Sequence, residues 1–211
     1  MASRTVLVPA SRVERWFENF ADRHGGFSCH VESGCLVASA ADGASCSAAL
    51  PFRRSYDGPA EVAVFAAAAG APACWGLLLV RKGGFAVARL DGPAMVASKV
   101  GRRHVQGRTK AGGQSQQRFA RRRANQAREA FEAAAGHAFT VLAAQPLNAL
   151  VCGGDRHAVH EVLTDPRLAG LTGLRTEPWL DVPDPRRAVL ERAVVDGSSA
   201  ILEVDDPEGG V

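Results

Sequence analysis

Residues 99–128 carry ten Lys and Arg side chains and no Asp or Glu, and this stretch constrains the fold more than any other part of the chain. Charged side chains stay in water unless they are paired, so such a run cannot enter a core. The rest of the 211-residue chain has 15 basic and 22 acidic residues, a net charge of −7. The protein is therefore an acidic body with one basic arm (residues 99–128), a distribution typical of polyanion-binding proteins.

The middle of the basic arm holds Gly112, Gly113 and Gln114 in succession. Glycine reaches backbone conformations that other residues avoid and lets the main chain approach a ligand closely. The glutamine amide is uncharged at physiological pH, so it can orient a water molecule or a leaving group but cannot act as a strong base. The sequence therefore predicts a loop that catalyses by positioning reactants. An ordinary turn is the structural alternative for a Gly-Gly pair beside a polar residue.

Residues 1–72 are expected to form a small α+β module. Residues 4–9 predict a strand, and Ser11 is a candidate N-cap for a helix that ends at Gly25. Residues 27–50 predict a meander of short strands, and residues 51–73 predict a loop and linker.

Residues 73–204 alternate strands and helices, which favours an α/β domain with a layered sheet and flanking helices. A hairpin is expected around Gly83 and Gly84, and Asp155 is the expected N-cap of a late helix. The expected strands are residues 75–80, 85–90, 94–105, 149–152, 174–176 and 200–204, and the expected helices are residues 114–136, 156–163 and 185–194. Residues 205–211 are expected to form a flexible tail.

The five cysteines show neither a paired spacing nor matching histidines, so the sequence predicts reduced thiols, no metal site and no cofactor. The N-terminus lacks the apolar core of a signal peptide. The apolar stretch of residues 60–80 is interrupted by Glu61, Gly70, Pro72 and Gly76, which argues against a membrane span. We therefore expect a cytoplasmic protein. The cysteines are Cys29, Cys35, Cys46, Cys74 and Cys152.

The glycine and glutamine loop, together with the basic residues behind it, resembles a known signature. Gly112-Gly113-Gln114-Ser115, followed by Arg118-Phe119-Ala120-Arg121 and Arg123, is similar to the middle domain of eukaryotic and archaeal class-I peptide release factors. The preceding hairpin and the later strand ending at Gly153-Gly154 look like the same domain, so the resemblance covers about residues 73–204. It implies an RNase H-like α/β domain that hydrolyses the ester between a nascent peptide and transfer RNA.

In that family the glutamine lies beside the ester. Its main-chain N–H helps to stabilise the reacting oxygens, and its side chain places or admits water. The resemblance assigns this role to Gln114, with Gly112 and Gly113 giving the loop its clearance.

A release factor that reads codons needs a large N-terminal module, and residues 1–72 are too short for one. The chain is therefore more similar to the release-factor-related peptidyl-tRNA hydrolases of the VLRF type, in their compact actinobacterial branch. This resemblance implies release of nascent chains from stalled large ribosomal subunits without stop-codon decoding, in ribosome-associated quality control. In that branch the active glutamine need not follow two glycines directly, so Gln116 and Gln117 are second candidates.

The expected partners are the large ribosomal subunit, peptidyl-tRNA and ribosomal RNA, and the protein is expected to be a monomer. Contacts to backbone phosphates would position the basic arm without reading sequence. The alternatives are a non-catalytic RNA-binding module and a nuclease that cuts transfer RNA, the latter ranked last because the arm has no carboxylate cluster for a metal. The candidate RNA-binding residues are Arg102, Arg103, Arg108, Lys110, Arg118, Arg121, Arg122, Arg123 and Arg128.

Overall fold

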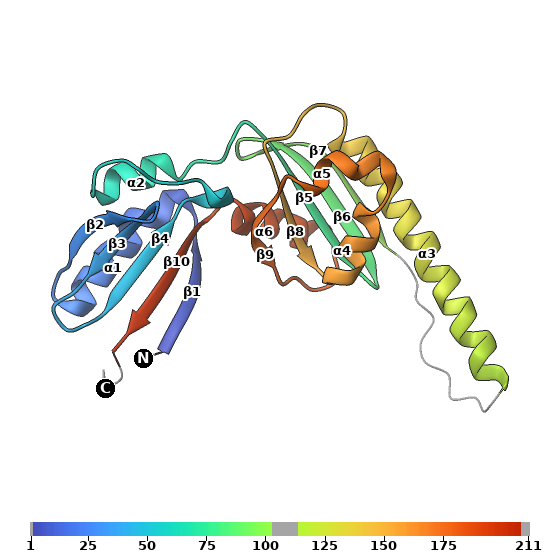
Figure 1. Ribbon diagram of the computed structural model, residues 1–211, viewed down its shortest axis with the longest axis horizontal. Helices are drawn as coiled ribbons and strands as arrows, with labels where there is room; N and C mark the ends of the chain where they lie inside the picture. The colour runs from blue at the N-terminus through green and yellow to red at the C-terminus, as the bar shows by residue number, and fades with distance from the viewer. Residues whose placement is uncertain (1, 103–113, 208–211) are drawn as a thin grey trace. The chain divides into compact units, whose positions relative to one another are not determined.

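The computed structural model describes residues 2–102 and 114–207, with the side chains of residues 3–102 and 128–207. The chain divides into two compact units, each built around its own five-stranded sheet (Figure 1). The first unit comprises Met1–Pro72 and Val194–Val211, and the second comprises Ala73–Ala193. Both units mix helices with strands, as the sequence predicts.

The first unit is an antiparallel sheet with two helices packed on one face. Its strand order is β1-β10-β4-β3-β2, and side chains from both helices join one side of these strands in a single apolar core. The predicted meander is confirmed. The strands are β1 (Ala2–Val8), β2 (Ser28–Glu32), β3 (Cys35–Ser39), β4 (Ser45–Ala49) and β10 (Ala200–Asp206), the helices are α1 (Val13–His24) and α2 (Val62–Ala68), and two 3-10 turns are η1 (Ala10–Arg12) and η2 (Pro51–Arg53).

Helix α1 forms where the sequence places it because Val13, Phe17 and Phe20 fall on one face and are all buried. The helix ends at Gly25, whose φ of 73° is the left-handed conformation that glycine adopts at little cost. Ser11 is not the N-cap, so that prediction is wrong. A 3-10 turn occupies Ala10–Arg12 instead, which makes Arg12 the residue before the helix.

Helix α2 corrects the expectation of a plain linker between residues 51 and 73. Phe65 and Ala66 are buried in the core, and Arg54 caps the helix by donating from Nη2 to the carbonyl of Ala68 at 3.0 Å and to that of Gly70 at 2.6 Å. Its seven alanine-rich residues are too few to give a clear helical period in the sequence. Among the residues that the structure describes, no helix is long and apolar enough to cross a membrane.

Strand β10 also departs from the predicted organisation. Residues 200–204 are expected beside residues 73–193, but β10 pairs antiparallel with β1 and β4 in the first unit, with Leu202 opposite Val6 and Ala48. Asp205 and Asp206 belong to this strand, so any tail begins later than residue 205. Pairing between strands so far apart in the chain cannot be read from local sequence.

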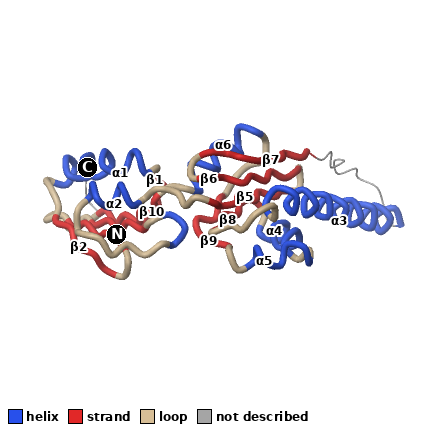
Figure 2. Tube along the Cα trace, turned by 90° about the horizontal axis from the view of Figure 1, so that it is seen from above, coloured by secondary structure: helices blue, strands red, loops and turns tan. Residues whose placement is uncertain are grey.

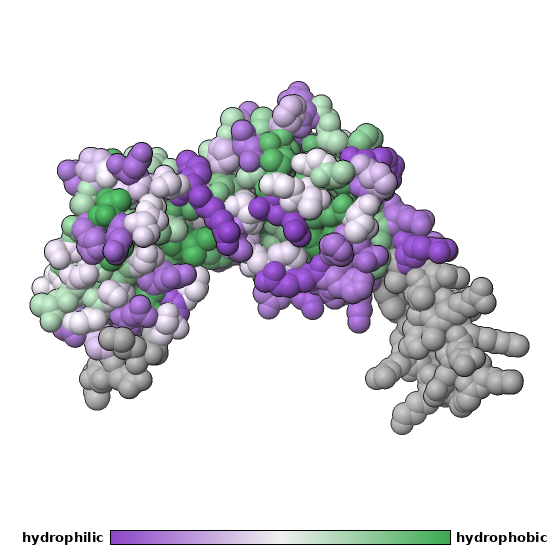
Figure 3. Space-filling model, viewed as in Figure 1, coloured by the Kyte–Doolittle hydropathy of each residue, from purple (hydrophilic) through white to green (hydrophobic). Residues whose placement is uncertain are grey.

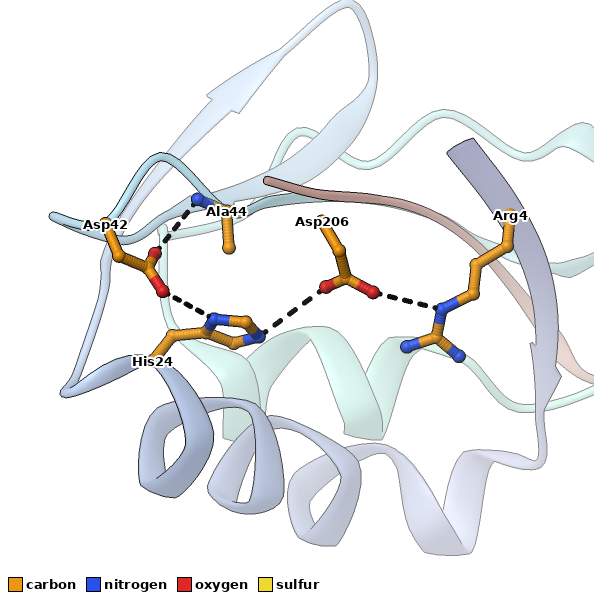
Figure 4. A network of polar contacts seen from close by, with 5 residues as sticks. All are labelled: Arg4, His24, Asp42, Ala44 and Asp206. Carbon is orange, nitrogen blue, oxygen red and sulfur yellow. Dashed lines mark hydrogen bonds and ion pairs between the residues drawn. The ribbon is translucent and has the colours of Figure 1, made fainter. Parts of the chain in front are cut away.

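The first unit also holds a network of polar contacts around His24 (Figure 4). The ring Nδ1 lies 2.8 Å from Asp42 Oδ2, and Nε2 lies 3.6 Å from Asp206 Oδ1. Arg4 donates from Nε to the other oxygen of Asp206 at 3.4 Å. The main-chain N–H of Ala44, and after it His24, lower the pKa of Asp42. The network therefore joins α1, the β3–β4 turn and the ends of β1 and β10.

The second unit has a mixed sheet of order β7-β6-β5-β8-β9, with helices on both faces. Strands β5, β6 and β7 pair antiparallel, whereas β5, β8 and β9 pair parallel. Figure 2 shows α6 on the side of the sheet opposite α3, α4 and α5. The strands are β5 (Cys74–Arg81), β6 (Gly84–Asp91), β7 (Ala94–Arg102), β8 (Ala149–Gly154) and β9 (Arg175–Leu180), and the helices are α3 (Gln114–Leu142), α4 (Arg156–Leu163), α5 (Ala169–Thr172) and α6 (Arg187–Gly197), with a 3-10 turn η3 (Pro166–Leu168). The division between the units falls within α6, after Ala193.

Two predicted features of this unit are confirmed, the β5–β6 hairpin and the N-cap of α4. Asp155 accepts from the main-chain N–H of Ala158 at 3.0 Å, which satisfies one free N–H of the helix. Helix α3, in contrast, does not stop near Gly136 but continues to Leu142. Burial of Ala138 and Leu142 against the sheet extends the helix past the glycine.

Candidate functional site

The basic arm leaves and rejoins the second unit at one edge of its sheet. Arg102, the last residue of β7, pairs with Gly84, which in turn pairs with Arg81 at the end of β5. Gly154, the last residue of β8, pairs with Val80. We call this the exit edge, because β5, β7 and β8 all end there. The carboxyl ends of parallel strands are the edge at which open α/β sheets bind their ligands.

Gln114 is the first residue of α3, and Gln116 and Gln117 lie in the same first turn. Three residues of an α-helix rise only about 4.5 Å, so the helix brings the three candidate glutamines together along its axis. Gly112 and Gly113 lie outside the described residues. The structure therefore places the glutamines at a helix start and leaves the choice among them as a prediction.

The C-terminal part of α3 fixes the helix to the second unit. Phe131 packs at the margin of the core, and Ala134, Ala135 and Ala138 are buried in it. His137 stacks on Phe85 of β6 with ring centroids 5.4 Å apart. Twenty residues separate Gln114 from Ala134, which corresponds to about 30 Å of helix at 1.5 Å per residue.

Two of the nine candidate RNA-binding residues have described side chains, and both are exposed. Arg102 ends β7 at the exit edge, and Lys99 of the same strand is exposed as well. Arg128 on α3 lies with Nε 3.7 Å from Glu132 Oε1, an ion pair in which both side chains remain about 70% exposed. Of the other seven, Arg103, Arg108 and Lys110 lie outside the described residues, and the side chains of Arg118, Arg121, Arg122 and Arg123 are not described.

The described residues offer no group of three or more metal-ligating side chains. All five cysteines are free, and burial raises the pKa of Cys46 and of Cys152 to about 12, so neither is a ready nucleophile. His157 is exposed on α4 and lies 3.9 Å from Glu161.

A comparison with protein families matches residues 73–203 to the family described as the Actinobacteria/chloroflexi VLRF1 release factor. The match covers more than half of the chain. The chain belongs to this VLRF1 release-factor family.

The VLRF1 match begins just before β5 and ends within β10, so it includes the whole basic arm and the strands and helices on either side of it. Among solved structures, the chain is similar to one described as the Vms1 mitochondrial localization core, at 12% sequence identity and a TM-score of 0.39, over 90% of this chain and 80% of that one. No curated protein matches the sequence.

The structure of this VLRF1-family chain also reveals a residue that the sequence does not single out. Arg89 on β6 is only 7% exposed and donates from Nη2 to Gln145 Oε1 at 2.8 Å, just beyond the end of α3. A second, longer contact runs from Nη2 to Cys74 Sγ at 3.8 Å. The sequence does show one arginine among the apolar residues of this strand. An alternating pattern of buried and exposed residues, however, predicts that such a charged position is exposed. Arg89 holds the segment after α3 against the sheet.

Proposed function

We propose that the chain is a peptidyl-tRNA hydrolase that frees nascent chains from stalled large ribosomal subunits without decoding a stop codon. This is a carboxylic ester hydrolysis in ribosome-associated quality control, in the cytoplasm. The observation that carries the proposal is membership of the VLRF1 release-factor family together with the position of Gln114, which lies in the basic arm and begins the long helix α3.

The position of Gln114 suits the stabilisation of an oxyanion. The first N–H groups of an α-helix have no acceptor within the helix, and the helix dipole adds positive potential at that end. A main-chain N–H at this place can therefore donate to the oxygen that becomes negative when water attacks the ester. The side-chain amide would orient that water, while Gly112 and Gly113 let the loop approach the substrate.

The basic arm would bring this loop into RNA. Its ten positive charges release counterions from phosphates and set the position of the loop without reading sequence. The helix that carries the glutamines is fixed to the second unit by the buried residues Ala134 and Ala138. Binding of the arm to RNA would therefore also set the position of the glutamines relative to that unit. In this proposal the ribosome supplies the remaining surroundings of the ester, and no cofactor takes part.

The second unit would be the catalytic domain, and we propose that it has an RNase H-like fold. Its strands in chain order are arranged 3-2-1-4-5, with the second antiparallel to its neighbours, which supports this assignment. The first unit would be an accessory module, and the protein would act as a monomer on the large subunit.

A peptide-release assay on isolated stalled large subunits tests the function. We expect wild-type protein to release peptide and to leave the transfer RNA with an intact end. Gln114→Ala should abolish release and retain subunit binding, with Ser115→Ala as the matched control. Full release by Gln114→Ala together with an inactive Gln116→Ala or Gln117→Ala would move the site within the first turn of α3. Salt-sensitive binding without release by the wild type would favour a non-catalytic binding module, and a shortened transfer RNA would indicate a nuclease.

A further inference from the structure

One face of the first unit's sheet carries no helix among the described residues of that unit. Alternate residues of each strand point into the core beneath α1 and α2, as Leu202, Val204 and Ala48 do. Their neighbours Glu203 and Ser47 lie on the opposite face, where the strand register sets them side by side. We call this opposite surface the open face. Its residues are Ser3, Thr5, Leu7, Ser28, His30, Glu32, Cys35, Val37, Ser39, Ser45, Ser47, Ala49, Ile201, Glu203 and Asp205.

The middle of the open face is flat because its side chains are short. Ser45, Ser47 and Ala49 of β4 and Cys35 of β3 are each partly accessible, and none extends far above the sheet. In Figure 3, pale residues near the middle of the hydropathy scale lie among hydrophilic and hydrophobic ones on the surface of the first unit. A surface of this kind lets another backbone approach closely.

The ionisable side chains that border this flat strip are three carboxylates and one histidine. Glu203 and Asp205 stand on β10, Glu32 and His30 stand on β2, and the fifteen residues include no Lys or Arg. The first unit as a whole has 6 basic and 12 acidic residues, a net charge of −6, whereas the second unit has 19 and 10, a net charge of +9. The open face therefore carries net negative charge, as does the unit to which it belongs.

These properties decide the chemical class of a partner. Sheets that bind single-stranded nucleic acid present several aromatic rings for stacking and cations for phosphates, and the open face has no Phe, Tyr, Trp, Lys or Arg. Its apolar side chains, Leu7, Val37 and Ile201, are separated by polar ones and form no continuous patch. A positively charged polypeptide matches the surface in both charge and flatness.

The size of the face limits how much of a partner it can hold. Five strands at about 4.8 Å spacing span roughly 19 Å, and five residues of strand span about 17 Å. A standard protein interface takes about 800 Å² from each partner, well above this area. One helix or one extended segment therefore fits the face better than a folded domain.

We propose that the open face docks a single Lys- or Arg-rich segment of a protein of the large ribosomal subunit, with Glu32, Glu203 and Asp205 facing its positive charges. This inference rests on the ribosomal setting of the proposed function. Proteins that bind RNA carry Lys and Arg to neutralise phosphates, so proteins of such a particle offer segments of this charge. The two units would thus contact different chemistry, the second RNA and the first protein.

Site-specific photo-crosslinking tests the proposal. A photoreactive amino acid replaces Ser47 at the centre of the open face, and the full chain is irradiated with purified stalled large subunits. We expect a crosslink to a basic subunit protein. The double variant Glu32→Lys/Glu203→Lys should reduce its yield on the order of tenfold, because like charges then face each other. The control Glu18→Lys/Asp22→Lys makes the same charge change on exposed positions of α1 and should keep the crosslink.

A crosslink from position 47 to RNA, no crosslink, or a crosslink that charge reversal leaves unchanged would each overturn the docking proposal. Thermal unfolding of both double variants confirms that they fold. Peptide release measured in the same samples separates the two proposals. A crosslink without peptide release by the wild type would contradict the proposed function and support the docking surface. Peptide release without a crosslink would support the proposed function and contradict the docking surface.

Discussion

Phe85, at the start of β6, stacks on His137 of α3 with ring centroids 5.4 Å apart and an interplanar angle of 24°. The contact lies at the exit edge, since the neighbouring residue Gly84 pairs with Arg102. It is therefore placed where α3 leaves the sheet on its way to Gln114. The stacking of Phe85 on His137 therefore helps to fix α3, and with it the basic arm, to the sheet.

Removing the ring of Phe85 should loosen the base of the arm. Phe85 is 9% exposed, so Phe85→Ala should lower the free energy of unfolding by about 3–5 kcal/mol through lost burial and a cavity. His137→Ala removes only the partner of the ring pair and should cost about 0.5–1.5 kcal/mol. Chemical denaturation measures both. Equal losses in the two variants would show that the stacking, and not burial of Phe85, dominates.

The hydrogen bond between Arg89 and Gln145 gives a second prediction. Gln145→Ala leaves the buried guanidinium without its one short side-chain acceptor among the described contacts, and Arg89 Nε already has no hydrogen-bond partner there. We expect a loss of about 1–3 kcal/mol. Arg89→Met removes the buried charge itself and should be less destabilising than Gln145→Ala. The double variant completes a thermodynamic cycle. A larger loss for Arg89→Met would mean that Arg89 makes contacts beyond Gln145 that matter more.

Local sequence signals account for much of the second unit. Gly83 and Gly84 between two apolar runs predict the hairpin, and Asp155 after a buried strand predicts the start of α4, as the structure confirms. These features depend on residues close together in the chain. The place of β10 depends on pairing across almost the whole sequence, as between Leu202 and Val6, and no local pattern encodes it.

The candidate site likewise has features that the local sequence predicts and features that depend on long-range pairing. The charge of the basic arm and the run from Gly112 to Gln114 are visible in the sequence. The exit edge is not, because it arises when Arg81, Arg102 and Gly154 come together through strand pairing. Helix α3 also passes Gly136, where a propensity argument ends it, since burial of Leu142 outweighs the cost of one glycine.

Acid should weaken the fold around the 3-10 turn η3, whose N-cap is Asp165. Two hydrogen bonds from the side chain of Arg167 and one from its main chain lower the pKa of Asp165 to about 2 from its usual 3.8. A group whose pKa is lower in the folded state stabilises the fold above its unfolded pKa and loses that contribution as pH falls through the folded value. Asp165→Asn should therefore make stability less dependent on pH between about 4 and 2. Denaturation at several pH values tests this, and an unchanged slope in Asp165→Asn would contradict the assignment.

Positive charge on the arm should set both the affinity for large subunits and its dependence on salt. Arg102 is exposed at the exit edge, and a side chain that contacts one phosphate contributes about one unit to the slope of log affinity against log salt. Arg102→Ala should reduce the slope by about that amount. Arg128→Ala should reduce the salt slope less, because Glu132, 3.7 Å away, already neutralises part of the charge of Arg128.

The matched controls for these variants are Arg12→Ala and Arg23→Ala, which remove the same charge from exposed positions of the first unit. The docking proposal places the first unit against protein, so these changes should leave the salt slope as it is in the wild type. Binding of labelled protein to purified subunits at several salt concentrations measures all four variants. A slope that falls equally for arm and control variants would show that net charge, and not the arm, governs the association, because long-range attraction depends on total charge whereas phosphate contacts depend on position.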